Sequence, residues 1–225
     1  TEIAINGTGI AGPTLAWWLK KYGHEPVLFE IAPKLRTGGY VIDFWGIGYD
    51  VAEMMGIVPQ LHERGYHMQE LRMLDSKGEP VAQMKLDSLR NELGNRFVTI
   101  PRGEIASIIY EACEGIETRF GTSVVGVSQQ SNGVDVSLSD GATESFDLLV
   151  GADGLHSKVR ETVFGPHSKF EKNLGYNVAA FYLPNYQPHE PNAYVSHTVP
   201  KRQVARMSLR DDQTLFCLLY TSPSP

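Results

Sequence analysis

The chain has 225 residues, 42% of them hydrophobic and 20% charged, which suits a soluble globular protein with one large domain or two small ones. Its net charge of -6 argues against a general nucleic-acid binder, and no apolar run is long enough to cross a membrane. Two cysteines, Cys113 and Cys217, have neither metal-ligand spacing nor a disulfide framework, so we expect no metal and a reducing, cytoplasmic setting.

Residues 3–30 predict a strand, a glycine turn, a helix and a second strand. The turn carries G-x-G-x-x-G. Gly7 permits a tight turn, Gly9 lets the backbone approach a pyrophosphate, and Gly12 lets the helix lie close to the strand. The helix, Pro13–Tyr22, offers unpaired N–H groups and partial positive charge to phosphates at its start.

Glu30 ends the second strand, Val27–Phe29, where a carboxylate is placed to accept hydrogen bonds from a ribose diol. The complete context favours a dinucleotide-binding unit. The alternative is an ordinary strand–helix–strand unit without a ligand.

The next loop contains Arg36 and Gly38–Gly39, followed by an extended aromatic segment, Tyr40–Trp45. Two interpretations stay open. The loop either lays Arg36 on a phosphate with an aromatic wall beside a flat ligand, or it is a surface loop leading into a core strand.

Periodicity then predicts a helix over Gly46–Gly56, a hairpin over Glu70–Met84 and a polar connection over Leu86–Gly94. A further helix lies within Phe97–Gly115, preceded by Pro101 and Arg102. A cation at a helix start is unfavourable, so we expect Arg102 to reach an anion elsewhere; a solvated arginine is the alternative.

Residues 116–145 alternate and predict a small antiparallel meander, and Asp147–Val150 predicts a buried strand. The turn that follows contains Asp153 and Gly154, at the strand end where open α/β sheets bind ligands. Ser157 is placed to cap the next helix. From Lys169 the chain changes to strand-like runs at residues 177–183, 193–199 and 203–209, the start of a sheet in a second domain.

These motifs together resemble the FAD-dependent aromatic hydroxylases, the single-component flavoprotein monooxygenases. The resemblance extends to about Phe216, and the loop from Arg36 to Gly46 looks most like the branch that includes the tetracycline-inactivating monooxygenases. It is carried by the fingerprint Gly7-x-Gly9-x-x-Gly12 with Glu30, by Pro101-Arg102-Gly103-Glu104, and by Asp147-Leu-Leu-Val-Gly-Ala-Asp-Gly154 with Ser157 and Arg160.

The resemblance implies a mixed α/β fold: a glutathione-reductase-like, Rossmann-type FAD domain interleaved with a β-sheet substrate domain. The implied segments are residues 1–72 and 97–166 for the FAD domain, 73–96 for a hairpin excursion, and 167–216 for the substrate sheet.

The resemblance also implies FAD contacts. Gly7, Gly9, Ala11 and Gly12 would line the pyrophosphate. Glu30 would hold the adenosine ribose, and Arg36, Asp43, Arg102, Asp153 and Gly154 complete the expected FAD set, Asp153 with a further part toward NAD(P)H. Aromatic residues are candidates for the substrate wall, with a role in the core as the alternative: Tyr40, Phe44, Trp45, Phe181 and Tyr182.

The implied reaction uses NAD(P)H, O2 and a flavin C4a-hydroperoxide to hydroxylate an aromatic or enol-containing small molecule. The cofactor carries this chemistry, so no catalytic acid or base is assigned. An FAD-dependent reductase or halogenase on the same scaffold, a plain NAD-dependent dehydrogenase and an inactive truncated fragment are the alternatives.

The family's third fingerprint is absent and would lie beyond residue 225, so we expect the chain to be the N-terminal part of a longer protein. The last segment, Cys217–Pro225, resembles a translated sequencing-adapter scar and is predicted to be non-native.

Overall fold

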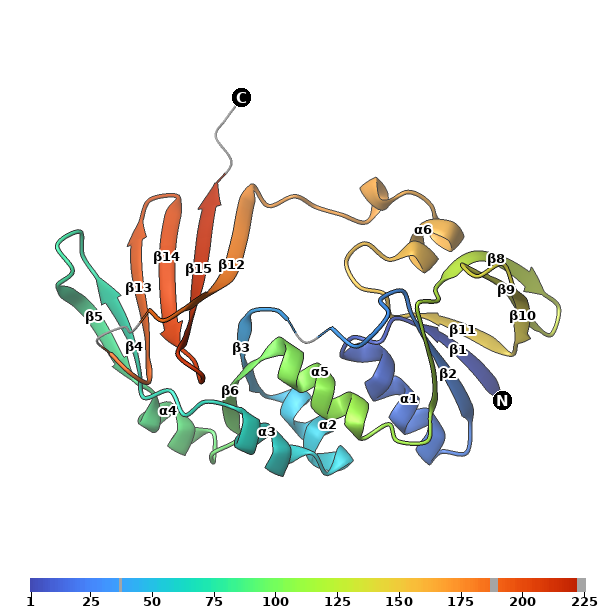
Figure 1. Ribbon diagram of the computed structural model, residues 1–225, viewed down its shortest axis with the longest axis horizontal. Coiled ribbons are helices and arrows are strands. Elements are labelled where there is room, and N and C mark those ends of the chain that lie inside the picture. Colours follow the sequence, from blue (N-terminus) through green and yellow to red (C-terminus); the bar gives the residue numbers. More distant parts are fainter. Residues whose placement is uncertain (37, 187–189, 222–225) are drawn as a thin grey trace. The chain divides into compact units, whose positions relative to one another are not determined.

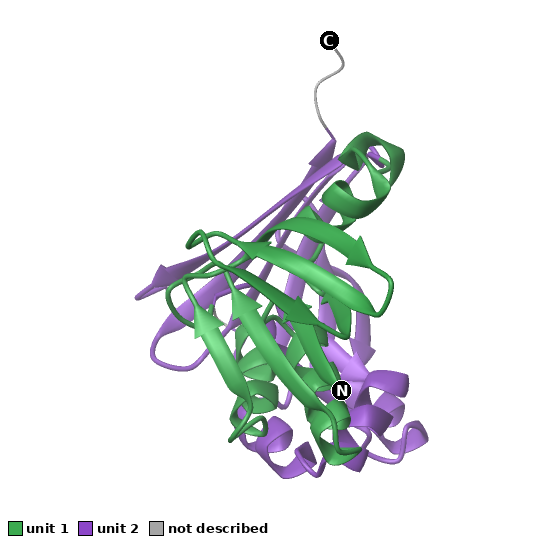
Figure 2. Cartoon of the chain, turned by 90° about the vertical axis from the view of Figure 1, so that its right-hand side faces the viewer, with its two compact units in different colours: residues 1–37, 103–172 green, residues 38–102, 173–225 purple. Residues whose placement is uncertain are grey.

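The computed structural model describes residues 1–36, 38–186 and 190–221, and the chain divides into two compact units. Figure 2 shows unit 1, residues 1–37 and 103–172, in green and unit 2, residues 38–102 and 173–225, in purple. Both units combine helices and sheets, as the predicted mixed α/β class requires. Their bounds differ from the four predicted segments, whose functional assignment stays a prediction.

Unit 1 is built on a parallel sheet of four strands in the order β11-β1-β2-β7. Figure 1 labels the first three of them. These strands are β1 (Glu2–Asn6), β2 (Glu25–Glu30), β7 (Glu117–Phe120) and β11 (Leu148–Gly151). A three-stranded antiparallel meander follows β7: β8 (Val124–Gln130), β9 (Gly133–Leu138) and β10 (Thr143–Phe146). The helices are α1 (Ala11–Lys21), α5 (Arg102–Glu111), α6 (Lys158–Phe164) and the short 3-10 helix η1 (His167–Lys169).

Alternation along the strands gives this sheet two apolar faces. One face buries Ile5 and Leu28 with Ala16 of α1. The other face buries Ala4 and Phe29 against a second cluster that includes residues of the meander and α6. Unit 1 is therefore layered, with the parallel sheet between helical and meander layers.

Unit 2 contains a six-stranded sheet in the order β12-β15-β14-β13-β4-β5 and a two-stranded sheet of β3 and β6. The large sheet comprises β4 (Glu70–Leu74), β5 (Pro80–Lys85), β12 (Tyr176–Pro184), β13 (Ala193–Val199), β14 (Arg202–Ser208) and β15 (Gln213–Thr221). The remaining elements are β3 (Val41–Trp45), α2 (Ile47–Met55), α3 (Val58–Arg64), α4 (Leu86–Glu92) and β6 (Phe97–Pro101). Within the six-stranded sheet, β13 pairs in parallel with β4, while the other neighbouring strands pair antiparallel.

Several predictions of secondary structure are confirmed. The opening strand–helix–strand unit forms, as do the hairpin of β4 and β5, the meander of β8 to β10, and the late strands β12, β13 and β14.

Other expectations were wrong in detail. The predicted polar connection after Lys85 contains α4, because Leu86 and Arg90 lie four residues apart on one buried face of a helix. Residues 97–101, grouped with a helix, form β6, which pairs with β3. The strand predicted over Asp147–Val150 is β11, an edge strand whose Leu148 is 51% exposed, so it is not a buried strand.

Two further differences concern the ends of predicted elements. Glu117–Phe120, expected in the meander, joins the parallel sheet beside β2. Cys217–Thr221, predicted to belong to a non-native tail, forms the second half of β15 and pairs with β12 and β14. The origin of that segment stays a prediction, and Ser222–Pro225 lies outside the described residues.

Across the described ranges, no helix is long and apolar enough to cross a membrane. In the same residues, no group of three His, Cys, Asp or Glu side chains is placed to hold a metal ion.

Candidate functional site

The glycine turn follows β1 at the carboxyl end of the parallel sheet of unit 1. Gly7 has φ +114, a conformation that disfavours side chains, and its N–H donates to the Phe29 carbonyl at 2.8 Å. A Cβ at Gly7 would lie 2.4 Å from the Ala152 carbonyl oxygen. Glycine is therefore required here by the backbone itself, and the turn packs directly on the segment after β11.

Helix α1 begins immediately after this turn. A Cβ at Gly12 would lie only 1.9 Å from the Gly7 carbonyl oxygen, so the helix approaches the turn as closely as glycine allows. Ile10 occupies the N-cap position and supplies no side-chain hydrogen bond, while Ala11 is exposed at the first helical position. Pro13 has no N–H to satisfy. The start of α1 thus presents backbone N–H groups without a side-chain cap.

Glu30 closes the turn from the end of β2. One carboxylate oxygen, Oε2, accepts the Thr8 N–H at 3.0 Å, and the other, Oε1, accepts the Ala32 N–H at 2.9 Å. The Arg36 guanidinium also contacts Oε1 at 3.2 Å, although its side chain remains 69% exposed. This buried carboxylate therefore fixes the glycine turn, and Arg36 extends from it toward solvent.

Asp153 is the centre of the second turn. Its Oδ2 accepts hydrogen bonds from Asn6 Nδ2 at 3.1 Å and from the N–H groups of Lys158 and Val159 at 2.7 and 3.2 Å. Its Oδ1 accepts the Ser157 hydroxyl at 2.5 Å. Burial acts to raise the pKa of Asp153, but these hydrogen bonds outweigh burial and lower the pKa below its usual value.

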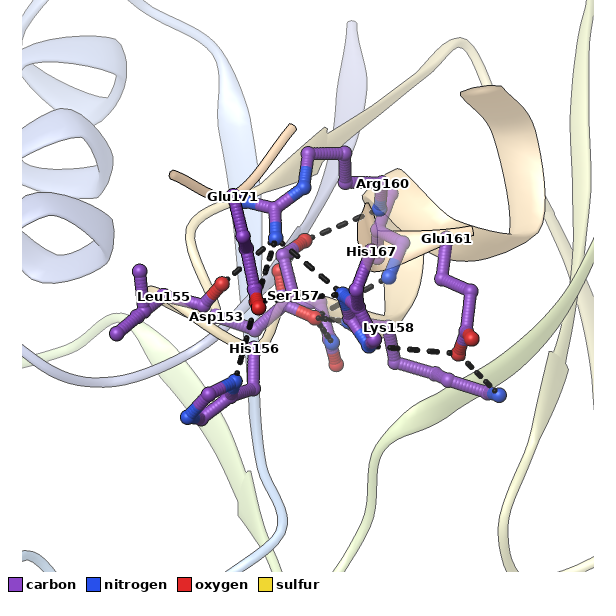
Figure 3. Close-up of polar contacts among 11 residues, drawn as sticks. Asp153, Leu155, His156, Ser157, Lys158, Arg160, Glu161, His167 and Glu171 are labelled. Atoms are coloured by element: carbon purple, nitrogen blue, oxygen red, sulfur yellow. Dashed lines mark hydrogen bonds and ion pairs between the residues drawn. The ribbon is translucent and has the colours of Figure 1, made fainter. Parts of the chain in front are cut away.

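Ser157 caps α6 as expected, since its hydroxyl oxygen accepts the Arg160 N–H at 3.0 Å. Beyond the cap, Figure 3 shows the Arg160 guanidinium directed at the Leu155 carbonyl, to which it donates at 2.6 Å. Arg160 also contacts His167 at 3.3 Å and Glu171 at 3.8 Å. These contacts tie the Asp153 turn to α6 and η1.

The two turns lie side by side. Strands β1 and β11 are parallel neighbours with Asn6 opposite Gly151, and the Ala152 N–H donates to the Asn6 carbonyl at 2.8 Å. The buried Asn6 side chain also accepts the Val124 N–H at 3.0 Å. Since β1 connects through α1 to β2 on one side and borders β11 on the other, the turns flank the switch point where open α/β sheets bind ligands.

Two other predicted FAD contacts belong to unit 2. Asp43 on β3 lies opposite Thr99 on β6, and the Thr99 hydroxyl donates to its Oδ1 at 2.7 Å. Arg102 is exposed at the start of α5, and its N–H donates to the Tyr40 carbonyl at 2.9 Å.

Unit 2 contains a partly open cavity of about 680 Å³, mostly apolar, on one face of its large sheet. The lining residues are Tyr40, Val41, Asp43, Met68, Leu71, Leu86, Thr99, Val178, Tyr194, Met207, Leu215 and Cys217. Burial, then the nearby Cys217 and Asp43, raise the pKa of Tyr194, which keeps its phenol neutral. This is the size and character of a small-molecule site.

The cavity includes one of the five aromatic residues predicted for the substrate wall, Tyr40. Phe44 instead packs near Tyr49, with ring centroids 6.4 Å apart, and Trp45 is 55% exposed. Phe181 stacks on Phe216 at 5.7 Å, and the Tyr182 hydroxyl donates to the Gly39 carbonyl.

Of the other lining residues, Asp43 was predicted as an FAD contact. The rest were missed, chiefly because the strands that carry most of them lie far apart in the sequence. Leu71, Tyr194, Met207 and Leu215 come from four strands, and only the pairing register places them on one face. The available signal was the alternation within each strand, which marks a face but does not identify its partner strand.

Comparison with known proteins identifies the family of this chain. A family model described as an FAD binding domain matches residues 1–222. A flavin-dependent monooxygenase from an unknown prokaryotic organism is 36% identical over 192 residues, which cover 82% of this chain and 47% of that protein. A flavin-dependent monooxygenase from Legionella longbeachae is 32% identical with the same coverage of both chains. The chain therefore spans about half the length of these curated relatives.

Solved structures of similar proteins have the same fold as this chain. Tetracycline destructase Tet(55) superimposes with a TM-score of 0.85 at 29% identity, covering 99% of this chain and 56% of that one. Klebsiella pneumoniae HpxO complexed with FAD and uric acid has a TM-score of 0.82 at 22% identity, covering 100% and 57%, and supports the fold alone.

Proposed function

Because the chain belongs to the FAD binding domain family of flavin-dependent monooxygenases, we propose that its protein is an FAD-dependent monooxygenase whose dinucleotide site is the paired turns of unit 1. The observation that carries this proposal is the junction of the Gly7 turn with the Asp153 turn at the switch point of the parallel sheet. A nucleotide's phosphates would meet the uncapped start of α1 there.

The residues of unit 1 fit FAD. Gly7, Gly9, Ala11 and Gly12 form the turn and helix start that would bind the pyrophosphate, whose negative charge suits free N–H groups. Glu30 would bind the adenosine ribose while it holds the Thr8 N–H.

The proposed parts of the other unit 1 residues also follow from their contacts. Arg36 is exposed and anchored to Glu30, so its guanidinium is free to bind a phosphate on its solvent side. The Asp153 carboxylate is already engaged by several donors, so we assign it a positioning part: it holds its own turn, with Gly154, beside the glycine turn. The proposed contacts of Asp43 and Arg102 with FAD rest on the family resemblance.

Bound FAD would supply redox chemistry and the activation of O2, with NAD(P)H as the proposed reductant. The protein's part is to orient the reactants and exclude water. The cavity of unit 2 is the proposed site for an aromatic or enol-containing small molecule, because it is apolar and carries a few polar groups at Tyr40, Asp43, Thr99 and Tyr194. The oxygen-transfer route implied by the resemblance is part of this proposal.

FAD titration of the purified 225-residue chain tests the proposal, with FMN as the matched control because it lacks the adenosine and one phosphate. We expect saturable quenching of flavin fluorescence by the chain, with clearly weaker binding of FMN. Anaerobic addition of NADH or NADPH should then bleach the bound flavin. A folded chain that binds neither flavin, or binds FMN as tightly as FAD, would contradict the assigned site.

A further inference from the structure

The described lining of the unit 2 cavity contains a negatively charged side chain but no positively charged one. Most of its lining is aliphatic or aromatic, and the polar members include the hydroxyls of Tyr40, Thr99 and Tyr194. Among the described lining residues, Asp43 is the one carboxylate, and no lysine, arginine or histidine is present. A ligand in this cavity therefore meets a negative charge without a facing positive one.

Asp43 has hydrogen-bonding capacity left for a ligand. It lies on β3 directly opposite Thr99, whose hydroxyl donates to Oδ1 at 2.7 Å and fixes the carboxylate. Within the part of the chain that the structure describes, Oδ2 accepts no hydrogen bond. A carboxylate oxygen is a strong acceptor, so this atom favours a donor on the ligand.

Arg90 is a cation that interacts electrostatically with Asp43, and it is not among the residues that line the cavity. Its buried guanidinium lies 3.5 Å from the Asp87 carboxylate, 3.4 Å from a His67 ring nitrogen and 5.5 Å from the centre of the Phe97 ring. Arg90 therefore weakens the field of Asp43 from outside the set of lining residues.

We propose that this cavity selects uncharged or cationic ring compounds that donate a hydrogen bond, and that Asp43 is the residue that determines this specificity. A phenol O–H or an ammonium N–H on the ligand pairs with Oδ2. A ring that carries a carboxylate is disfavoured because its anion loses water against apolar side chains and faces a like charge. This inference rests on the proposed function, in which the cavity holds the substrate.

The test uses three probes on one ring system: 6-hydroxy-2-naphthamide, 6-(aminomethyl)-2-naphthol and 6-hydroxy-2-naphthoate. Their binding to the full 225-residue chain is measured by titration calorimetry at pH 7.5. We expect the neutral and cationic probes to bind roughly tenfold more tightly than the anionic one, the size of effect that a partly solvated charge a few ångströms away produces.

Asp43→Asn removes the charge and keeps the side-chain shape, so the preference should fall to within about twofold through tighter binding of the naphthoate. Glu92→Gln is the matched control. Glu92 is an exposed acid on α4 outside the cavity, and the loss of its charge should leave the preference unchanged.

The proposal is overturned if the unaltered chain binds the naphthoate as tightly as the amide, or if it binds none of the three probes. It is also overturned if Asp43→Asn and Glu92→Gln change the preference equally. The ranking on the unaltered chain decides the matter even if a variant fails to fold. FAD titration is a separate measurement, so loss of flavin binding with the ranking intact would refute the proposed function and leave the charge selection standing.

Discussion

Replacing Gly12 with alanine tests whether the start of α1 binds the FAD pyrophosphate. The new Cβ would lie 1.9 Å from the Gly7 carbonyl oxygen, and neither partner is a flexible side chain. Real Cβ atoms essentially never come closer than 3.0 Å to such an atom, so turn and helix must separate by about 1 Å. The separation would move the N–H groups of the first turn of α1 away from the positions proposed to bind phosphate.

The expected loss follows from the hydrogen bonds affected. A hydrogen bond to a charged group contributes about 1.5–3 kcal/mol, so weakening two of them costs about 3 kcal/mol. That cost corresponds to a roughly hundredfold higher Kd for FAD. Flavin fluorescence titration gives the Kd, and circular dichroism on the same sample reports whether the chain is folded.

Gly23→Ala is the matched control at the other end of the same helix. Gly23 has φ +83 and open space around it, so alanine there strains the backbone by about 1 kcal/mol without touching the turn. We expect a lower Tm and an unchanged Kd for FAD. A folded Gly12→Ala chain that binds FAD within twofold of the unaltered chain would refute the assignment of the pyrophosphate to this turn.

Four further results are expected. The pKa of Asp153 is lowered in the folded chain, so its carboxylate stabilises the fold above the unfolded pKa, about 3.9. This contribution is lost as the pH falls through the folded pKa. The urea midpoint of Asp153→Asn should therefore decline less below about pH 4 than the midpoint of the unaltered chain. Ser157→Ala removes the cap of α6 and should lower the free energy of unfolding by about 1 kcal/mol in the same assay, whereas an unchanged value would contradict the capping role. Burial raises the pKa of Cys113 to about 11, so only about one thiol in a thousand is ionised at pH 8; labelling of the native Cys217→Ser chain by a disulfide reagent should be slow and should rise about tenfold per pH unit. Met207→Ala empties part of the cavity wall, where the side chain is 2% exposed, and should cost about 2–5 kcal/mol in chemical unfolding.

The dinucleotide unit was predictable from sequence because its requirements are local. Gly7 and Gly12 act within a few residues of each other, and the apolar runs on either side of α1 form neighbouring strands. Nearby residues carry the whole signal, since the sequence spacing alone determines that the turn, helix and second strand meet.

The remaining features depend on contacts between distant residues. Asp153 was predicted as a ligand-binding carboxylate, but its bond to Asn6 spans 147 residues and makes it a structural anchor as well. Helix α4 was not predicted because its buried face includes Arg90, and an arginine in the sequence indicates an exposed polar position. Only the folded chain shows that Phe97 and Asp87 surround its side chain. Tyr194 and Leu71 became cavity residues only through the parallel pairing of β13 with β4.

The two helices that begin at the carboxyl edge of the unit 1 sheet, α1 and α6, differ in whether side chains already accept hydrogen bonds from their first N–H groups. At α6, the Ser157 hydroxyl and the Asp153 carboxylate already accept the first N–H groups, so a phosphate would have to displace a bound carboxylate and face its charge. At α1, the N-cap residue is Ile10, which has no acceptor in its side chain, and the turn before it is built from glycine. Under the proposed function, an anion at this sheet edge would therefore bind at α1, and Asp153 beside α6 would hold the neighbouring turn in place.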